Sequence, residues 1–215
     1  MSRVQHGGVT ALVLAGGRAT RMGGIDKGLQ AFNGVPLALH ALNRLRQAKN
    51  PLIAACAINV NRHLDTYAQW GYPVWPDTLE GQPGPLAGWI TGLRRCTTRH
   101  LLTLPCDAPS FPLDLIERLA QGFAEADTDI AVACAPDEQG MLRRQPVFAL
   151  VSTSLASDLD DFLRRGGHKV GQWLDRHCTV AVPFDQPGDD PFAFENINTL
   201  EHLRALEQRQ DSPAP

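Results

Sequence analysis

The chain has 215 residues, of which 43% are hydrophobic and 20% are charged, and its formal net charge at pH 7 is −3. This composition is typical of a globular protein with enough apolar material for a core, and the length fits one domain. The slightly acidic balance excludes a global basic field, so we expect neither nucleic acid nor a membrane surface as a partner.

The first half of the chain alternates short apolar runs with amphipathic segments. The apolar runs predict strands at Val9–Ala15, Leu52–Ile58, Pro73–Pro76, His100–Leu104 and Ile130–Cys134. The segments between them predict helices at Pro36–Gln47, Arg62–Trp70, Pro85–Arg95 and Pro112–Phe123. Alternating strands and helices with short connections predict a parallel sheet with helices on both faces.

The second half of the chain continues the pattern less regularly. It predicts strands at Pro146–Leu150, Thr179–Phe184 and Phe192–Ile197, and helices at Ser152–Arg165, Val170–His177 and Thr199–Arg209. We therefore expect an α/β protein with a three-layer α/β/α Rossmann-like fold around a mostly parallel central sheet. A single domain would cover residues 1–210, and residues 211–215 would form a disordered tail.

Polar residues follow several of the predicted strands. A glycine-rich loop begins at Gly16, and Asp77 and Asp107 each come just after the end of a strand. Ligands of such sheets bind at the carboxyl ends of the strands. We therefore expect these residues to contribute to one site.

The glycine-rich loop, Leu14–Gly28, has the sequence LAGGRATRMGGIDKG. Its glycines let backbone N–H groups face phosphate oxygens, and Arg21 and Lys27 add positive charge suited to a triphosphate. It is not a Walker A loop, because Lys27 is followed by Gly28, and it lacks the GxGxxG pattern of dinucleotide-binding loops. The alternative interpretation is a glycine-rich turn with two solvated cations.

Asp107 lies in the segment LPCDAPS, directly after a predicted strand. A carboxylate at this place can hold Mg²⁺ against phosphate oxygens, and magnesium needs only one or two protein ligands. The alternative is a turn or N-cap aspartate before Pro109. The neighbouring phosphate-binding loop favours the metal-binding interpretation.

The segment Leu14–Gly28 resembles the signature of nucleotidyltransferases that activate sugar phosphates and cofactors. Its DKGL ending, Asp26–Leu29, is most similar to the molybdenum cofactor guanylyltransferases (MobA type). The resemblance covers nearly the whole chain, because it continues through NVNRH at 59–63, Asp77, PGPLAG at 83–88, PCDAP at 105–109 and NINT at 196–199. The first motif is highly specific, whereas the others are short and persuasive only together.

This resemblance implies an enzyme that transfers GMP from GTP to the molybdenum-molybdopterin cofactor, releases pyrophosphate and uses Mg²⁺. Its N-terminal half would bind GTP and its C-terminal half molybdopterin. The nucleotide-binding residues that we expect are Leu14, Ala15, Gly16, Gly17, Lys27, Asn59, Asp77, Gly84 and Asp107. The catalytic residues that we expect are Arg21, Lys27 and Asp107, and Asp107 would also bind the metal.

Several of these assignments keep an alternative. The Asp77 carboxylate matches the N1–H and N2–H₂ donors of guanine, but a turn residue after Pro76 fits equally well. Asn196 and Asn198 are candidates for molybdopterin contact or for a second metal oxygen, and Asn198 could instead cap the last helix. The second half of the chain also contains several basic residues. They could form a basic rim for the anionic cofactor or simply be solvated surface charges: Arg143, Arg144, Arg164, Arg165 and Lys169.

The expected reaction is in-line attack by the terminal phosphate of molybdopterin on the α-phosphorus of GTP. A phosphate monoester is already a nucleophile at neutral pH, so catalysis depends on positioning and electrostatics. A cytidylyltransferase for the same cofactor shares the LAGG opening and remains an alternative. A sugar-phosphate nucleotidyltransferase fits less well, because such enzymes often carry additional domains. A non-catalytic cofactor carrier would not need both Lys27 and Asp107.

The remaining features concern the surroundings of the protein. Its five cysteines show no CxxC spacing, which favours reduced thiols. Residues 1–8 lack the apolar core of a signal peptide and no run of about 18 apolar residues occurs, so we expect a cytoplasmic protein. The resemblance implies transient contact with molybdoenzymes or their chaperones, and we expect a monomer.

Overall fold

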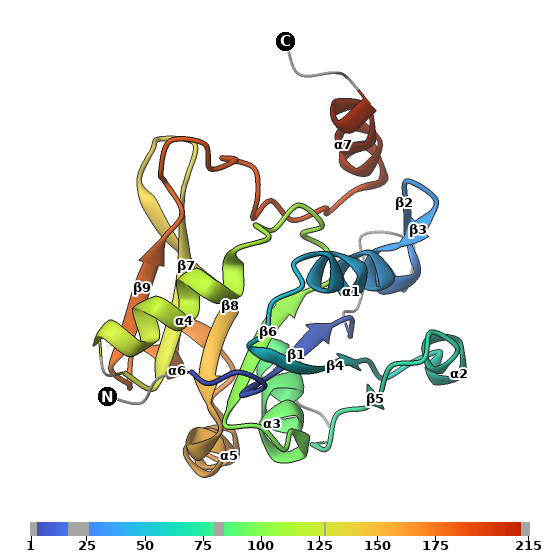
Figure 1. Ribbon diagram of the computed structural model, residues 1–215. Helices are drawn as coiled ribbons and strands as arrows, with labels where there is room; N and C mark the ends of the chain where they lie inside the picture. The colour runs from blue at the N-terminus through green and yellow to red at the C-terminus, as the bar shows by residue number, and fades with distance from the viewer. Residues whose placement is uncertain (1–3, 17–25, 80–83, 127, 212–215) are drawn as a thin grey trace.

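The centre of the molecule is a seven-stranded sheet with the strand order β5-β4-β1-β6-β8-β7-β9 (Figure 1). The structure is a computed structural model that describes residues 4–16, 26–79, 84–126 and 128–211. The strands are β1 (Val9–Leu14), β4 (Ile53–Asn59), β5 (Val74–Trp75), β6 (His100–Pro105), β7 (Ile130–Pro136), β8 (Leu142–Ser152) and β9 (Thr179–Pro183). Only β8 runs antiparallel to its neighbours within this sheet, which confirms the mostly parallel sheet expected from the sequence.

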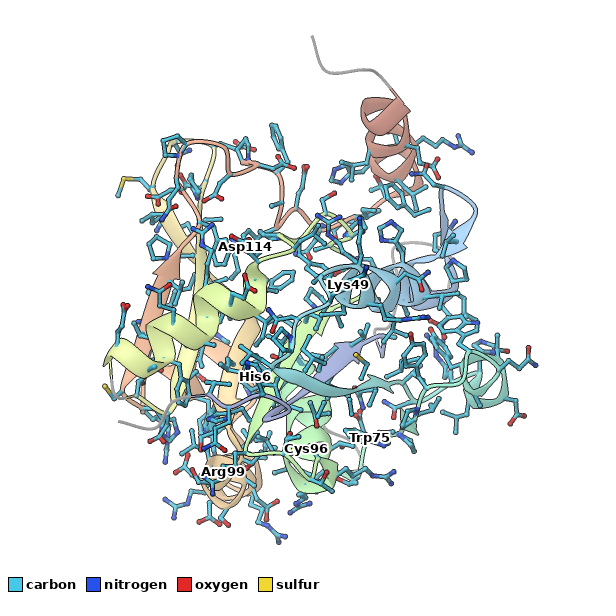
Figure 2. All side chains as sticks on the ribbon, viewed as in Figure 1. His6, Lys49, Trp75, Cys96, Arg99 and Asp114 are labelled. Carbon is cyan, nitrogen blue, oxygen red and sulfur yellow. The ribbon has the colours of Figure 1, made fainter. Side chains whose placement is uncertain are left out.

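Helices cover both faces of the sheet, as the alternating pattern predicts (Figure 1). The helices are α1 (Leu37–Gln47), α2 (Leu64–Ala68), α3 (Pro85–Arg95), α4 (Leu115–Ala126), α5 (Ala156–Arg164), α6 (Val170–Leu174) and α7 (Leu200–Asp211). Apolar side chains of α1 and α4 pack on one face, and those of α3, α5 and α6 pack on the other. β1 contributes to both layers, since Val13 faces the first and Leu12 the second. Side chains fill the space between sheet and helices (Figure 2).

Several local predictions differ from the structure. The predicted last strand at Phe192–Ile197 is wrong, because the Asp190 side chain accepts a hydrogen bond from the Phe192 N–H at 2.9 Å and the chain turns there. α4 begins at Leu115 rather than at Pro112, since Pro112 belongs to the preceding turn. α7 extends to Asp211, and the rest of the predicted disordered tail lies outside the described residues.

A small hairpin and two short 3₁₀ turns complete the described elements. β2 (Ala31–Phe32) and β3 (Val35–Pro36) form the hairpin, and the 3₁₀ turns are Lys27–Leu29 and Thr153–Leu155. A separate apolar cluster joins the hairpin region and α1 to α7 and includes Phe32, Leu37, Ile197, Leu203 and Leu206. The C-terminal segment is thereby held against the part of the chain that follows the glycine-rich loop. Among the described residues, every helix is too short or too polar to cross a membrane.

Candidate active site

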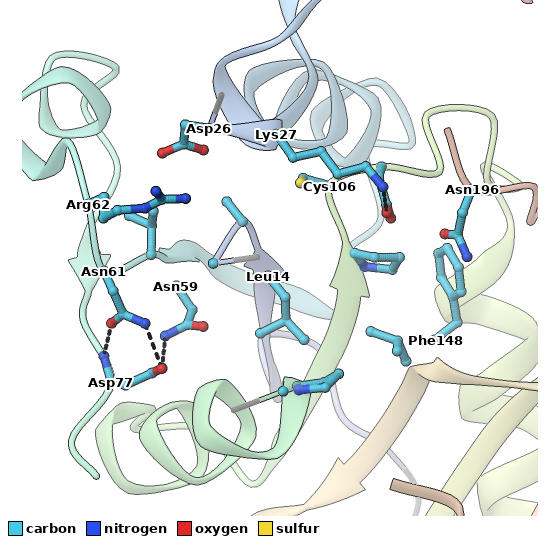
Figure 3. A pocket seen from close by; sticks show the side chains of 18 of the residues that line it. Leu14, Asp26, Lys27, Asn59, Asn61, Arg62, Asp77, Cys106, Phe148 and Asn196 are labelled. Carbon is cyan, nitrogen blue, oxygen red and sulfur yellow. Dashed lines mark hydrogen bonds and ion pairs between the residues drawn. The ribbon is translucent and has the colours of Figure 1, made fainter. Parts of the chain in front are cut away.

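A cavity of about 980 Å³ lies at the carboxyl ends of β1, β4, β5 and β6 (Figure 3). Parallel strands place their carboxyl ends at one edge of the sheet, which is where the sequence predicted the site. The expected site residues that line the cavity are Leu14, Ala15, Gly16, Lys27, Asn59, Asp77, Gly84, Asp107 and Asn196. Gly17 and Arg21 lie outside the described residues.

Lys27 and Asp107 meet on one wall of the cavity. The Lys27 Nζ lies 2.5 Å from Asp107 Oδ2 and 3.2 Å from Asn198 Oδ1. The ion pair is largely shielded, with 16% of the Lys27 side chain and 18% of the Asp107 side chain exposed. Residues from the 3₁₀ turn, the end of β6 and the C-terminal segment are thus brought together, although Asn198 is far from the other two in sequence.

The oxygen atoms at this wall suit a divalent cation. Asp107 Oδ1 is buried and has no hydrogen-bond partner among the described residues, so it is a free acceptor beside the ion pair. Asn198 presents an amide oxygen to the same ammonium group. Magnesium binds through one or two protein oxygens together with phosphates and waters. The described residues contain no cluster of three or more His, Cys, Asp or Glu side chains, so these oxygens fit Mg²⁺ only with a phosphate substrate.

Asp26 and Tyr67 fix the backbone from which Lys27 projects. The buried Asp26 carboxylate accepts hydrogen bonds from the Gly28 N–H at 3.1 Å and the Tyr67 hydroxyl at 2.8 Å. Burial, then the hydrogen bond to Asp26, raises the pKa of Tyr67, so the hydroxyl remains a donor. Gly28 allows this contact, because a Cβ there would lie 2.3 Å from the Tyr67 hydroxyl oxygen. Tyr67 was not expected here from the sequence, since only the fold brings α2 to this loop.

Asn59, Asn61 and Asp77 form a second polar group on the other side of the cavity, next to β4 and β5 (Figure 3). Asn59 donates from Nδ2 to Asp77 Oδ1 at 2.8 Å and to the Trp75 carbonyl at 2.9 Å. Asn61 donates to Asp77 Oδ2 at 2.6 Å. Asn59 and Asp77 were expected here from the sequence, whereas Asn61 was missed. The available signal was its position two residues after Asn59 in the NVNRH segment.

Gly88 of α3 leaves the space that Asn59 occupies. A Cβ at Gly88 would lie 2.3 Å from Asn59 Oδ1 and 2.6 Å from Leu14 Cδ2. Atoms cannot approach this closely, so a larger residue would push both side chains out of place. This close packing gives a physical reason for a glycine at the end of the PGPLAG segment.

The loop that carries Asp107 is supported from two directions. The Ile197 N–H donates to the Asp107 carbonyl at 2.7 Å. Arg44 of α1 donates from Nε to the Phe111 carbonyl and from Nη2 to the Ser110 carbonyl at 3.2 Å. Burial lowers the pKa of Arg44 from its usual value, which is far above neutral, so the guanidinium stays charged. These contacts hold the residues just after Asp107.

The remaining wall of the cavity comes from β8 and the C-terminal segment. Gln145, Pro146, Val147, Phe148 and Asn196 line it. In the described part of the chain, the basic residues considered as a cofactor rim do not line the cavity. Three of them form ion pairs at the surface, namely Arg143 with Asp137, Arg144 with Asp175 and Arg164 with Asp160.

Cys106 precedes Asp107 and lines the cavity, but its chemistry is that of a buried side chain. It is 4% exposed. Burial, followed by the nearby Asp107 carboxylate, raises the pKa of its thiol, so the reactive thiolate is disfavoured. Cys106 is therefore a small packing residue rather than a nucleophile.

Comparisons with known proteins agree with this architecture. The model of the family described as "MobA-like NTP transferase domain" matches residues 11–180. A molybdenum cofactor guanylyltransferase from Acidovorax sp. (strain JS42) is 53% identical over 93% of this chain and 95% of that protein. Another from Ralstonia nicotianae is 50% identical over 94% of this chain and 97% of that protein.

Solved structures show the same fold. Molybdopterin-guanine dinucleotide biosynthesis protein A from Archaeoglobus fulgidus superposes with a TM-score of 0.73 at 21% identity, covering 94% of this chain and 98% of that one. A 4-diphosphocytidyl-2C-methyl-D-erythritol synthase from Anaerococcus prevotii gives a TM-score of 0.70 at 10% identity over 95% and 98% of the two chains. At these identities the likeness concerns the fold alone. The family model and the sequence relatives show that the chain belongs to the MobA-like NTP transferase family, together with the molybdenum cofactor guanylyltransferases.

Proposed function

We propose that the chain transfers GMP from GTP to the molybdenum-molybdopterin cofactor and releases pyrophosphate. Its family supports the class of reaction. The observation that carries the proposal for this chain is the meeting of Lys27 Nζ and the Asp107 carboxylate at 2.5 Å in a cavity at the carboxyl ends of the strands. A cation and a metal-binding carboxylate side by side are what a triphosphate substrate requires.

In the proposed reaction, an oxygen of the terminal phosphate of molybdopterin attacks the α-phosphorus of GTP. A new bond forms between this oxygen and the phosphorus, while the bond from the phosphorus to the bridging oxygen breaks and its electron pair leaves with pyrophosphate. Negative charge grows on the leaving group, so a positive group placed there lowers the barrier. We assign this role to Lys27, with assistance from Arg21, which is not among the described residues.

We propose Mg²⁺ as the cofactor, held by Asp107 with Asn198 as a second candidate oxygen. When bound, the ion would neutralise phosphate oxygens and help to align them for attack. The free Asp107 Oδ1 supports this assignment. The short contact between Lys27 and Asp107 would then be exchanged for contacts to the triphosphate and the ion.

The remaining roles follow the two sides of the cavity. Asn59 and Asp77, together with Gly16, Gly17 and Gly84, would bind the nucleotide. The wall that contains Asn196 would face molybdopterin, which fits a division into an N-terminal half for GTP and a C-terminal half for molybdopterin. We place the reaction in the cytoplasm and extend the proposal to a monomer that hands its product to molybdoenzymes or their chaperones.

The test is incubation of the protein with molybdenum-molybdopterin, Mg²⁺ and each of the four nucleoside triphosphates in turn. The proposal predicts pyrophosphate release and a molybdopterin guanine dinucleotide with GTP. A dinucleotide with CTP only would instead identify a cytidylyltransferase. Binding of the cofactor without pyrophosphate release from any triphosphate would identify a carrier.

A further inference from the structure

We propose that Asn61 is a positioning residue that sets base selectivity by holding the Asp77 carboxylate in one orientation. The inference rests on the proposed function, because it takes guanine as the base that Asp77 contacts. Asn61 and Asp77 form a closed pair of hydrogen bonds (Figure 3). Asn61 Nδ2 donates to Asp77 Oδ2 at 2.6 Å, and the Asp77 N–H donates to Asn61 Oδ1 at 2.7 Å.

The carboxylate of Asp77 is held from both sides. Asn59 donates to Oδ1 at 2.8 Å and Asn61 donates to Oδ2 at 2.6 Å. An ionised carboxylate has about four acceptor positions, two on each oxygen. One position on each oxygen is therefore used within the protein and one remains for a ligand. Two remaining acceptors in a fixed plane match the two parallel donors N1–H and N2–H₂ of guanine.

The main chain next to Asp77 is also held in place. The hydrogen bonds from Asn59 and Asn61 therefore act on the Asp77 side chain, whose rotation they restrict. The Thr78 N–H donates to Thr91 Oγ1 at 3.1 Å, and Thr91 is a fully buried residue of α3. Asn59 is itself buried against Gly88, so changing it would disturb the core. Asn61 is exposed, and its side chain can therefore be changed with little effect on packing.

The position of Asn61 connects the base side of the cavity with the phosphate loop. A Cβ on Gly16 would lie 3.6 Å from Asn61 Nδ2, so the first described glycine of that loop lies beside Asn61. A nucleotide whose phosphates contact Gly16 would therefore extend past Asn61 toward Asp77. This places Asn61 between the two, where it can orient the recognition group.

Selectivity follows from the fixed orientation. Adenine and cytosine each place a lone pair beside their exocyclic amine, and this lone pair would face a carboxylate oxygen that cannot turn away. Hypoxanthine, the base of ITP, keeps N1–H but lacks the N2 amine, so it leaves one acceptor unpaired. A carboxylate freed from Asn61 can rotate to accept a single donor, which weakens GTP binding and reduces discrimination against ITP.

The experiment compares GTP and ITP as donors for the wild-type protein, Asn61→Ala, Asn61→Asp and the control Asn43→Ala. Asn43 is an exposed asparagine on α1 that does not line the cavity. KM and kcat are measured for each donor, and equilibrium binding of both nucleotides is measured in parallel. Thermal unfolding of each variant reports whether it is folded.

For Asn61→Ala we expect a rise in the KM for GTP of about tenfold, with a smaller change in kcat. This is the scale for losing the hydrogen bond to the charged Asp77 carboxylate, while the exposed Asp77 N–H can bond to water instead. The preference for GTP over ITP should fall by about the same factor. Asn61→Asp should lose more, because it places a second carboxylate against Asp77. Asn43→Ala should match the wild type.

The inference is overturned if Asn61→Ala keeps the wild-type ratio of kcat/KM for GTP to kcat/KM for ITP. An equal loss of efficiency with both donors would give this result and would indicate a merely structural role. Equal use of GTP and ITP by the wild type would also overturn it while leaving guanylyl transfer intact. Absence of transfer by the wild type would instead contradict the proposed function, and the binding data would still decide whether Asn61 controls the preference for guanine.

Discussion

The two polar groups of the cavity are built in different ways. On the side that we propose for the base, the base side, Asp77 is held by Asn61 and Asn59, which lie only 16 and 18 residues away in the sequence. On the side that we propose for the triphosphate, the phosphate side, Lys27 contacts Asp107 and Asn198, which are 80 and 171 residues away. The base side uses short amide side chains, whereas the phosphate side uses a long ammonium side chain paired with the carboxylate.

This difference indicates two kinds of preparation for a ligand. The base side keeps acceptor positions available in a fixed plane, so little rearrangement is needed before binding. The phosphate side holds its charges as an ion pair, which a polyanion and a divalent ion would replace with new contacts. Changes on the phosphate side should therefore affect the rate of transfer most, and changes on the base side should affect nucleotide affinity most.

The largest effect is expected on the phosphate side. Lys27→Ala and Asp107→Ala should each reduce the single-turnover rate of GMP transfer by about 100-fold or more, the scale for losing one transition-state contact. Lys169→Ala is the matched control, because Lys169 is exposed and does not line the cavity. Rates near that of the wild type in both active-site variants would break the comparison and remove both residues from the proposed mechanism.

The next largest effect is expected from Gly88→Ala, which tests the base side. The added Cβ would lie 2.3 Å from Asn59 Oδ1 and must displace it, at a cost of about 1–3 kcal/mol for overpacking. We expect the KM for GTP to rise by about tenfold, with a smaller change in kcat. Gly171→Ala in α6 is the control, since a Cβ there has open space. If kcat fell while the KM stayed constant, Asn59 would belong with the rate-determining groups.

A smaller effect is expected from Tyr67→Phe, which removes one of the two hydrogen bonds to the buried Asp26 carboxylate. Leaving a buried acceptor less satisfied should lower the free energy of unfolding by about 1–3 kcal/mol. Because Asp26 also fixes the turn that carries Lys27, kcat should fall several-fold while the KM for GTP changes little. Tyr72→Phe serves as the control. An unchanged kcat in a measurably destabilised protein would separate Asp26 from the positioning of Lys27.

The smallest effect concerns an ion pair that does not line the cavity. Arg118 of α4 binds Asp189 at 2.8 Å, and this hydrogen bond holds the pKa of Asp189 below its usual value. A lowered folded-state pKa stabilises the protein above the unfolded pKa of about 3.9, and this stabilisation is lost as the pH falls through the folded pKa. Asp189→Asn should therefore reduce stability by up to about 1 kcal/mol at pH 7 and have less effect at pH 3.

Thermal unfolding of Asp189→Asn between pH 3 and pH 7 checks this expectation, and Asp161→Asn, at an exposed position on α5, is the control. GMP transfer should be unaffected at neutral pH. A penalty that did not shrink toward acid pH would show that the Asp189 charge is not the source of the stabilisation.

Much of the fold was predictable, because most of the strands and helices leave a local pattern in the sequence. The buried run at Val9–Leu14 and the proline at the start of α3 are examples. The predicted strand at 192–197 failed because an Asp190 side chain closes a turn there, which outweighs the apolar residues. The hairpin of β2 and β3 was missed because its strands are only two residues long.

The candidate site was predictable where a residue follows a strand. Asp77 and Asp107 were found in this way, Asn59 was expected from the family resemblance, and all three line the cavity. Tyr67 and Arg44 were not found, because each lies on a helix and reaches the site only through tertiary packing. A tyrosine or arginine in a helical pattern carries no local sign of such a contact.

The central claim is that Asp107 binds a divalent ion that acts on the same triphosphate as Lys27. It is tested most directly by measuring the equilibrium affinity for GTP with and without Mg²⁺, in the wild-type protein and in Asp107→Asn. We predict that Mg²⁺ increases the affinity of the wild type and has little effect on the variant. The same increase in both proteins would contradict the claim, because the ion would then be bound without Asp107.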